Sequence, residues 1–401
     1  MGGWRAAVDA WIDQFSGELR SIRRHLHAHP EPSREEYGTT RFLAEVLETA
    51  GVPRVIAPTG RGIFAGPNAE VGDPVIAIRA DIDGLRIHDQ KTVSYRSTRD
   101  GVMHACGHDA HATMVLGAAL ALWRFRTELP ERLKWRAIFQ PSEEVGEGAQ
   151  EMIAAGAMEG VRAIVALHVD PEVAVGKVAY RPGILTAYCQ DLEVRIKGTG
   201  GHAARPHQTV DPIGVATQFI AATYQFVPRS VDSREPVVLT FGSIQGGTTA
   251  NAIPEEVVLK GTVRTLSEAA ALRVEHRLRQ ISGGLAEASG AEIEVVIRKG
   301  TDAIVNDPEV TLVCTRAAAE IVGSENLEEI RLPSMGGEDF SAYLKHAPGC
   351  LLRLGTSSGN DPTYFLHSPH FDLDERALVI GTKILAHSTV LLAETLGSGS
   401  P

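Results

Sequence analysis

The sequence has few cysteines, no excess of positive charge and no long apolar segment. Its four cysteines, Cys106, Cys189, Cys314 and Cys350, are too few and too scattered along 401 residues to form a disulfide framework. Thiols of this kind persist in a reducing compartment, so we expect a cytoplasmic protein.

The charge balance and the hydropathy pattern exclude two classes of partner. The chain has 39 basic and 50 acidic residues, a formal net charge of -11, which argues against binding to nucleic acid or to an anionic membrane. The longest apolar run, residues 112–123, is too short to span a bilayer and predicts a buried helix. Residues 1–15 have apolar side chains at helical spacing but lack the continuous apolar core of a signal peptide, so export is not indicated.

The length and the hydrophobic pattern indicate two domains. A chain of 401 residues is longer than one hydrophobic core normally organises. Short apolar, β-rich runs at 75–79, 136–139 and 163–167 alternate with helical patterns such as 39–50 and 111–126. This alternation predicts an α/β fold with a mostly parallel sheet flanked by helices, in which ligands gather at the carboxyl ends of the strands.

A second, inserted domain is predicted at residues 186–298, so that the first domain comprises residues 1–185 and 299–401. The insertion has the order strand, helix, strand, strand, helix, strand. These elements are expected at 191–197, 211–226, 237–244, 257–264, 267–289 and 292–298. The order is that of a ferredoxin-like α+β domain.

Cys106 and His108 lie in the segment MHACGHDAHATM, which leads into an Ala-rich helical pattern. Two such donors, one residue apart at a helix N-terminus, can face a single cation, and the helix end lowers the pKa of the thiol. Taken alone, the pair fits equally well a buried cysteine beside a hydrogen-bonded histidine.

Glu143 and Glu144 lie in FQPSEEVGEGA, directly after the apolar run that ends at Phe139. Neighbouring acids at a strand end point in different directions, so one can bind a metal while the other reaches the attacking water. An isolated Glu-Glu pair more often forms a solvated acidic turn. The position after a buried strand favours the functional interpretation.

Further imidazoles follow the same pattern. His168, in VALHVD, ends another apolar run, although a histidine there is more often structural than a ligand. His367 and His370, in FLHSPHFD, precede the last helical pattern. Together these segments supply Cys, His and Glu donors at one edge of the sheet. That set suits two divalent transition ions with a shared ligand, because a single ion with so many donors would have no position left for substrate.

Ten segments, in order along nearly the whole chain, carry a more specific resemblance. They are RRHLHAHPEPSREE, RADIDGL, MHACGHDAHATM, QPSEE, ALHV, KGTGGHAARPH, TTANAIP, GTVRT, MGGEDF and LHSP. The sequence resembles the amidohydrolase branch of the aminoacylase and glutamate-carboxypeptidase superfamily of metallopeptidases, which includes hippurate hydrolases, N-acyl-amino-acid deacylases and plant indole-acetyl-amino-acid hydrolases. This resemblance implies a zinc-peptidase-like catalytic domain and a homodimer formed through the inserted lid domain.

The resemblance also implies roles for individual residues. Two divalent ions per subunit, of zinc, manganese, nickel or cobalt, would be bound by Cys106, His108, Glu144, His168 and His367. Glu143 would be the general base. His202 would contact the scissile carbonyl or the substrate carboxylate, reaching into the site of a partner subunit. Asn251 and Arg264 would help to bind a carboxylate, for which the planar fork of arginine is suited. From the residues alone, a surface salt bridge explains Arg264 equally well.

One departure from the wider superfamily concerns the early strand. Many relatives carry His-x-Asp there, whereas this chain reads Arg79-Ala80-Asp81. Arginine cannot ligate a metal, so the Cys-x-His pair is expected to supply ligands instead, and Asp81 becomes the candidate acid that orients a ligating histidine. The three histidines of RRHLHAHP are expected to pack near the site without ligating.

We therefore predict a metal-dependent hydrolase that cleaves the amide bond of N-acyl amino acids or related small-molecule amides. One alternative is a dipeptidase or aminoacylase-type exopeptidase with the same metal centre. Another is a catalytically silent metal-binding or peptide-binding protein, against which an intact Glu143 argues. No Gly-x-Ser-x-Gly motif suggests a covalent acyl-enzyme.

Overall fold

The computed structural model describes residues 3–70, 73–130, 133–359 and 364–397. The chain forms two compact units. The main unit comprises Met1–Gly183, Ile304–Leu332 and Asp339–Pro401, and the inserted unit comprises Ile184–Ala303 and Pro333–Glu338. The short segment Pro333–Glu338 thus packs with the inserted unit, whereas the sequence assigned it to the last part of the main domain.

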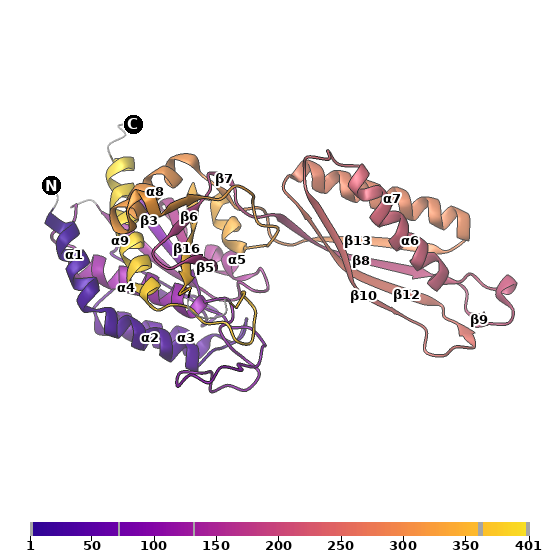
Figure 1. Ribbon diagram of the computed structural model, residues 1–401, viewed down its shortest axis with the longest axis horizontal. Coiled ribbons are helices and arrows are strands. Elements are labelled where there is room, and N and C mark those ends of the chain that lie inside the picture. Colours follow the sequence, from indigo (N-terminus) through magenta and orange to yellow (C-terminus); the bar gives the residue numbers. More distant parts are fainter. Residues whose placement is uncertain (1–2, 71–72, 131–132, 360–363, 398–401) are drawn as a thin grey trace. The chain divides into compact units, whose positions relative to one another are not determined.

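An eight-stranded sheet runs through the main unit in the order β1-β2-β4-β3-β5-β16-β6-β15. Its strands are β1 (Arg54–Ile56), β2 (Ile63–Ala65), β3 (Val75–Asp81), β4 (Lys134–Gln140), β5 (Val161–Ala174), β6 (Val178–Tyr180), β15 (Leu327–Glu329) and β16 (Gly349–Ser357). Strands β3, β5, β6 and β16 of this sheet are labelled in Figure 1. The four central strands, β4, β3, β5 and β16, are parallel. Every residue of β3 is buried, as in a strand covered on both faces. The predicted α/β fold class is confirmed.

Helices cover this sheet. They are α1 (Gly3–Gln14), α2 (Ser16–Ala28), α3 (Tyr37–Thr49), α4 (His108–Arg124), α5 (Gly148–Ala154), α8 (Pro308–Val322) and α9 (Arg376–Gly397). Residues 108–122 of α4 are all buried, in agreement with the helix predicted from the longest apolar run. The stretch Arg376–Leu396 of α9 is also long and apolar enough to cross a membrane, but 72% of its apolar window is buried inside the protein, as in a core helix.

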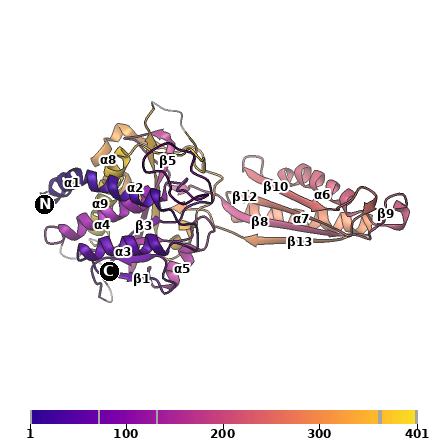
Figure 2. The same cartoon turned by 90° about the horizontal axis from the view of Figure 1, so that it is seen from below.

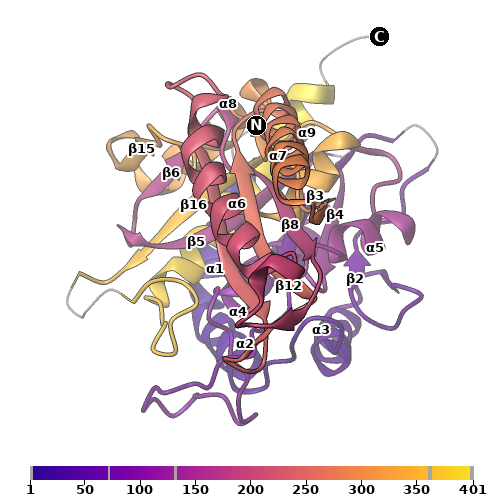
Figure 3. The ribbon, with the colours of Figure 1, turned by 90° about the vertical axis from the view of Figure 1, so that its right-hand side faces the viewer.

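The inserted unit has an antiparallel four-stranded sheet in the order β10-β12-β8-β13. Its main elements are β8 (Tyr188–Lys197), α6 (Pro212–Phe226), β10 (Val237–Gly246), β12 (Glu256–Thr265), α7 (Glu268–Ser289) and β13 (Glu292–Lys299). Asp211 and Ser267 accept backbone N–H groups at the starts of α6 and α7, which lie side by side on the sheet (Figure 3). This is the ferredoxin-like arrangement that the sequence predicts.

Two smaller strand pairs lie outside these two sheets. They are β9 (Gly201–His202) with β11 (Ala252–Ile253), and β7 (Gly183–Ile184) with β14 (Val305–Asn306). The β9 strand lies at one end of the inserted unit (Figures 1 and 2).

Candidate metal centre

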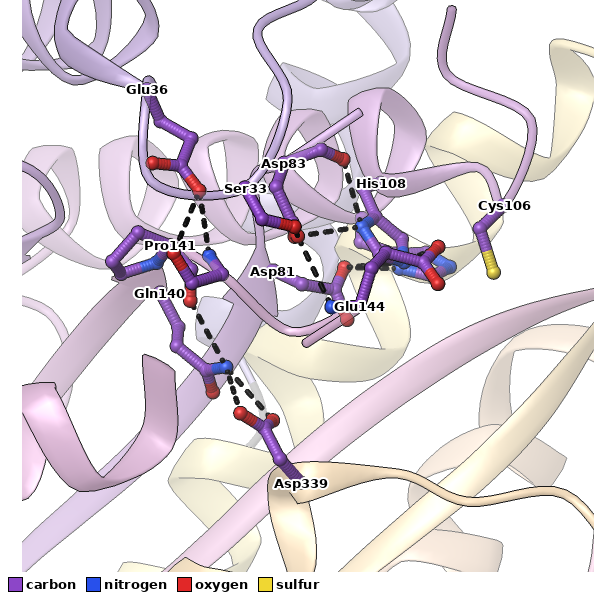
Figure 4. A network of polar contacts seen from close by, with 12 residues as sticks. Ser33, Glu36, Asp81, Asp83, Cys106, His108, Gln140, Pro141, Glu144 and Asp339 are labelled. Atoms are coloured by element: carbon purple, nitrogen blue, oxygen red, sulfur yellow. Dashed lines mark hydrogen bonds and ion pairs between the residues drawn. The ribbon is translucent and has the colours of Figure 1, made fainter. Parts of the chain in front are cut away.

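The predicted metal donors come from elements that meet at the carboxyl edge of the main sheet (Figure 4). Glu143 and Glu144 follow β4, and His168 lies in β5. Cys106 and His108 stand at the N-terminus of α4. Parallel strands bring these segments, far apart in sequence, to one place.

Gly107 allows Cys106 and His108 to face the same space. Its φ of 83° is in the left-handed region, which glycine adopts without steric cost. A Cβ atom at this position would lie 2.3 Å from Cγ2 of Val169. The glycine is therefore required both by the backbone conformation and by the close approach of β5.

All five predicted metal ligands lie together. Donor atoms of Cys106, His108 and His168 are within 4.8 Å of one another, and so are those of Cys106, Glu144 and His367. Because Cys106 belongs to both groups, its sulfur is in a position to be shared between two ions. A third group joins His108 to Glu144 and Glu143.

Hydrogen bonds fix the tautomers of two of these histidines. Nδ1 of His108 donates to Asp83, with O at 3.0 Å and Oδ1 at 3.2 Å, and Nδ1 of His168 donates to the Val169 carbonyl at 2.8 Å. In the neutral form of each ring, the lone pair is therefore on Nε2. Nε2 of His108 is buried without a hydrogen bond, and Nε2 of His168 lies 3.6 Å from Cys106 Sγ. Buried lone pairs beside a thiol fit metal ligation.

His111 belongs to another group of potential donors, with Asp81 and His108. However, its Nε2 accepts the Val169 N–H at 2.9 Å, so the proton is on Nδ1, which donates to Asp81 at 2.6 Å. Both ring nitrogens are used, and no lone pair remains for a metal. His111 instead connects Asp81 to the backbone beside His168.

Asp83, and not Asp81, orients the candidate ligand His108. Asp83 also accepts hydrogen bonds from Ser33 Oγ at 2.7 Å and from the Glu144 N–H at 3.1 Å (Figure 4). It thus contacts two candidate ligands, one at the start of α4 and one in the turn after β4. Sequence reasoning missed this residue, although the second acid of RADIDGL was the available signal.

Arg79, which replaces the histidine of the wider superfamily, has a structural position. Its guanidinium is buried and donates to Asp81, Asp339 and Gln140 at 2.7, 2.8 and 2.8 Å. Asp339 also accepts hydrogen bonds from the Gln140 amide. The arginine therefore compensates two buried carboxylates beneath the metal centre.

His367 reaches the centre from a loop. Its φ is 65°, its backbone N–H donates to the Ala105 carbonyl at 2.8 Å, and its Nε2 lies 3.5 Å from Glu144 Oε1. His370, the neighbouring candidate, instead packs its ring 5.2 Å from that of Tyr364. Of the two, His367 is the one with a place among the donors.

The pKa values of the donors are shifted in different directions. Burial acts to lower the pKa of His108, but the charges of Asp81 and Cys106 outweigh it and raise this pKa well above its usual value, so His108 must lose a proton before it can ligate. Burial, followed by the charge of Arg353, lowers the pKa of His168 well below its usual value, so its imidazole is neutral. Burial raises the pKa of the Cys106 thiol, the opposite of the lowering expected from the helix end, so formation of the thiolate depends on a nearby cation. Thiol, imidazole and carboxylate donors of this kind fit two divalent transition ions.

The inserted unit carries the candidate substrate-binding residues, at two separate places. His202 of β9 and Asn251 beside β11 are neighbours, since the Ala203 N–H donates to the Asn251 carbonyl at 3.1 Å. Both side chains are exposed. Arg264 lies at a different place, on β12, where it pairs with Cys189 of the neighbouring strand β8.

The guanidinium of Arg264 is partly used. Nη1 donates to Cys189 Sγ at 2.9 Å and to the Met335 carbonyl at 3.4 Å, and Nε donates to Thr262 Oγ1 at 3.2 Å. Among the residues that the structure describes, no acidic side chain forms an ion pair with Arg264. The alternative that Arg264 only forms a surface salt bridge is therefore not supported. Nη2 is the donor that remains for a substrate carboxylate.

The fold and the donor set define a class, a metal-dependent hydrolase that acts on amide bonds. The chain belongs to the peptidase family M20/M25/M40, which matches residues 77–389. The resemblance stated from the sequence motifs is thus confirmed.

Relatives agree with this assignment. The chain is 38% identical over 386 residues to N-acetyl-L-cysteine deacetylase of Bacillus subtilis, covering 96% of this chain and 90% of that protein. It is 34% identical to thermostable carboxypeptidase 2 of Saccharolobus solfataricus, covering 96% and 95%. The solved structure of the Bacillus subtilis YXEP protein, a dinuclear metal binding peptidase from the M20 family, superposes with a TM-score of 0.81 at 33% identity, covering 96% and 99%. Two divalent ions per chain are therefore supported.

Proposed function

We propose that this chain hydrolyses the amide bond of N-acyl amino acids or of related small amides. The observation that carries the proposal is the position of Glu143, which lies within 4.8 Å of donor atoms of His108 and Glu144 but outside the two groups that contain Cys106. An acid that lies next to the predicted ligands without being one of them remains available for proton transfer. The residues that would hold the ions are Cys106, His108, Glu144, His168 and His367.

The reaction needs one proton to be moved twice. The ions, when bound, supply Lewis acidity that makes water more acidic and stabilises charge on the carbonyl oxygen. Glu143 takes a proton from the attacking water as the new C–O bond forms. It gives this proton to the amide nitrogen as the C–N bond breaks, which releases a carboxylic acid and an amine. His202 is the candidate donor to the oxyanion.

The internal geometry of the inserted unit supports a role for His202 in a partner subunit. Glu256 pairs with Lys197 towards β9, whereas Arg264 pairs with Cys189 towards the start of the unit. The eight residue steps from position 256 to 264 correspond to about 26 Å of strand, at roughly 3.3 Å per residue. A small amide cannot span that distance. We therefore infer that Arg264 and the pair His202 and Asn251 serve different sites of a dimer, and that His202 and Asn251 serve the partner's.

A surface of the inserted unit suits contact with a second copy. β10 is an edge strand, on which Val238 and Ile244 are exposed. Ile213, Tyr224 and Phe226 of α6 are exposed as well. Unpaired strand edges and apolar side chains favour association, which supports a homodimer formed through this unit.

Mixing two inactive variants tests the dimer. His202→Ala protein mixed with Glu143→Ala protein is expected to recover part of the activity, because one site of each hybrid dimer keeps both residues. His207→Ala, which changes another exposed histidine of the same unit, is the control and should remain active. Demonstrated subunit exchange without recovery, or an active monomer, contradicts the role in trans.

A substrate panel tests the reaction. Protein reconstituted with zinc, manganese, cobalt or nickel should hydrolyse N-acetyl or N-benzoyl amino acids faster than dipeptides. Faster cleavage of dipeptides would favour the exopeptidase alternative. The similarity to a carboxypeptidase is the reason for including dipeptides in the panel. Turnover of none of them would favour a binding protein.

We also propose a cytoplasmic location. All four cysteines are free and buried, and none of the proposed steps needs a disulfide. Cell fractionation tests this, and recovery in a secreted or envelope fraction would contradict it.

A further inference from the structure

The backbone next to the metal centre contains strained residues. Among the described residues other than glycine, Arg34, Ser142 and His367 have positive φ values, of 72°, 56° and 65°. Such conformations are unfavourable for residues with a Cβ atom and cluster at functional sites. His367 is a candidate ligand. Ser142 begins the acidic turn, by which we mean Ser142, Glu143 and Glu144.

Glu36 contacts both of the other strained residues. Its Oε1 accepts hydrogen bonds from the Ser142 N–H at 2.7 Å, the Ser142 hydroxyl at 3.1 Å and the Arg34 N–H at 3.1 Å. Glu36 directly precedes α3, but its side chain does not cap that helix. Glu31 accepts the N–H groups at the start of α3 instead. The side chain of Glu36 is thus directed to the acidic turn.

This position is costly for a carboxylate. Glu36 is fully buried, and its Oε2 makes no hydrogen bond. The facing cation is Arg61, 3.5 Å from Oε2, and Arg61 is also paired with Glu151 at 3.0 Å. Burial, followed by the negative charge of Asp83, raises the pKa of Glu36 to about 7. A neutral side chain at this position would make the folded protein more stable, so stability alone does not explain a glutamate here.

We propose that Glu36 is a positioning residue that keeps Ser142 in its left-handed conformation and thereby places Glu143 and Glu144 at the metal centre. The inference rests on the proposed function in so far as Glu144 ligates and Glu143 transfers protons. The other end of the acidic turn is attached separately, since the Glu144 N–H donates to Asp83 at 3.1 Å. Without the Glu36 contact, Ser142 can relax to an ordinary φ, which rotates the two acids while the Asp83 contact remains.

The variant Glu36→Gln tests this proposal because it keeps the side-chain shape but weakens the acceptor. Glu31→Gln is the matched control, since Glu31 lies in the same segment and also accepts two backbone N–H groups, but does not contact the acidic turn. The double variant Glu36→Gln with Ser142→Gly is the rescue, because glycine adopts a positive φ at no steric cost.

Two measurements separate positioning from folding. In the metal-loaded enzyme, Glu36→Gln should lower kcat by about tenfold to a hundredfold with little change in KM, as expected for misplaced catalytic groups. In calorimetric titration of the metal-free protein with zinc or manganese alone, it should weaken the affinity for an ion by about tenfold, the usual effect of losing an orienting contact. The double variant should recover most of both losses, and Glu31→Gln should behave as the parent.

Normal kcat and metal affinity in Glu36→Gln would overturn the proposal, and so would losses that Ser142→Gly does not restore. If Glu36→Gln fails to fold, Ser142→Val replaces it, since a β-branched residue resists positive φ, and a normal metal affinity in that variant would equally overturn the proposal. If the parent hydrolyses no acylated amino acid, the proposed function fails, but the metal titrations still decide the role of Glu36.

Discussion

The candidate ligands of the main unit and the candidate substrate-binding residues of the inserted unit are supported in different ways. His108 and His168 are buried, and each has Nδ1 bonded to a neighbouring acceptor. His202 and Asn251 are exposed on a two-stranded pair. The predicted metal ligands are therefore held by buried contacts before any ion binds. Within the described residues, the side chains of His202 and Asn251 are held only by exposed hydrogen bonds, from the Ala204 N–H and the Thr249 hydroxyl.

Two arginines show the same contrast. Arg79 in the main unit is buried and donates hydrogen bonds to the carboxylates of Asp81 and Asp339, so its positive charge is compensated within the protein. Arg264 in the inserted unit donates to a sulfur and a hydroxyl and meets no described carboxylate. An arginine whose charge is not compensated by the protein is suited to an anionic substrate. Changes in the main unit should thus affect chemistry or metal content, and changes in the inserted unit should affect substrate selection.

The largest expected effect separates the two acids of the main unit. Glu143→Gln should keep both ions and bind substrate, while kcat falls by about a hundredfold to ten-thousandfold, the usual contribution of a general base. Glu144→Gln should instead lose metal and recover part of its activity with excess divalent ion. Elemental analysis beside kcat measures both. A metal-free Glu143→Gln together with a fully loaded but inactive Glu144→Gln would reverse the two roles.

The second prediction concerns the cost of a buried acid. Burial raises the folded-state pKa of Glu36 from 4.5 to about 7, so the folded protein favours the protonated carboxyl group. The stability that this protonated group allows is fully present below about pH 4.5 and is lost as the pH rises through about 7. Glu36→Gln cannot ionise and should have a free energy of unfolding higher than the parent's by about 2–3 kcal/mol at about pH 8, with a smaller difference at about pH 5. Urea unfolding of the metal-free proteins at both pH values measures this. A pH-independent difference would contradict it.

The third prediction tests the inserted unit. Arg264→Gln should lower kcat/KM for an N-acyl amino acid by about tenfold to a hundredfold, the range expected for loss of a charge-assisted hydrogen bond. A matched amide without the carboxylate should be unaffected. Arg298→Gln, in the same unit and paired with Glu193, serves as the control. Equal losses for both substrates would show that Arg264 acts through the structure rather than through the carboxylate.

The smallest expected effect is on thiol reactivity. Cys106 as a ligand should be protected from alkylation while metal is bound and should react several-fold faster after chelation. Mass spectrometry distinguishes it from Cys189, Cys314 and Cys350, which provide internal controls. Equal labelling of Cys106 with and without chelator argues against ligation.

Local patterns in the sequence predicted most elements near their observed limits. The helix expected at 211–226 is α6 (Pro212–Phe226), and the strand expected at 75–79 is β3 (Val75–Asp81). The central strand β16 (Gly349–Ser357) was not predicted, although it pairs along β5. Its apolar run is short and contains glycine, and periodicity alone does not separate such a run from a helix segment or a loop.

The sequence by itself determined the donor types, their order and the family, because these depend on residue identity and spacing. It did not determine which acid orients which histidine, and it suggested Asp81 where Asp83 contacts His108. The contacts of Arg79 with Asp339 and of Glu36 with Ser142 join residues 260 and 106 positions apart. Only the tertiary structure decided these pairs, because a hydrogen bond needs its two atoms within about 3 Å. Strand order and register, rather than distance along the chain, set that separation.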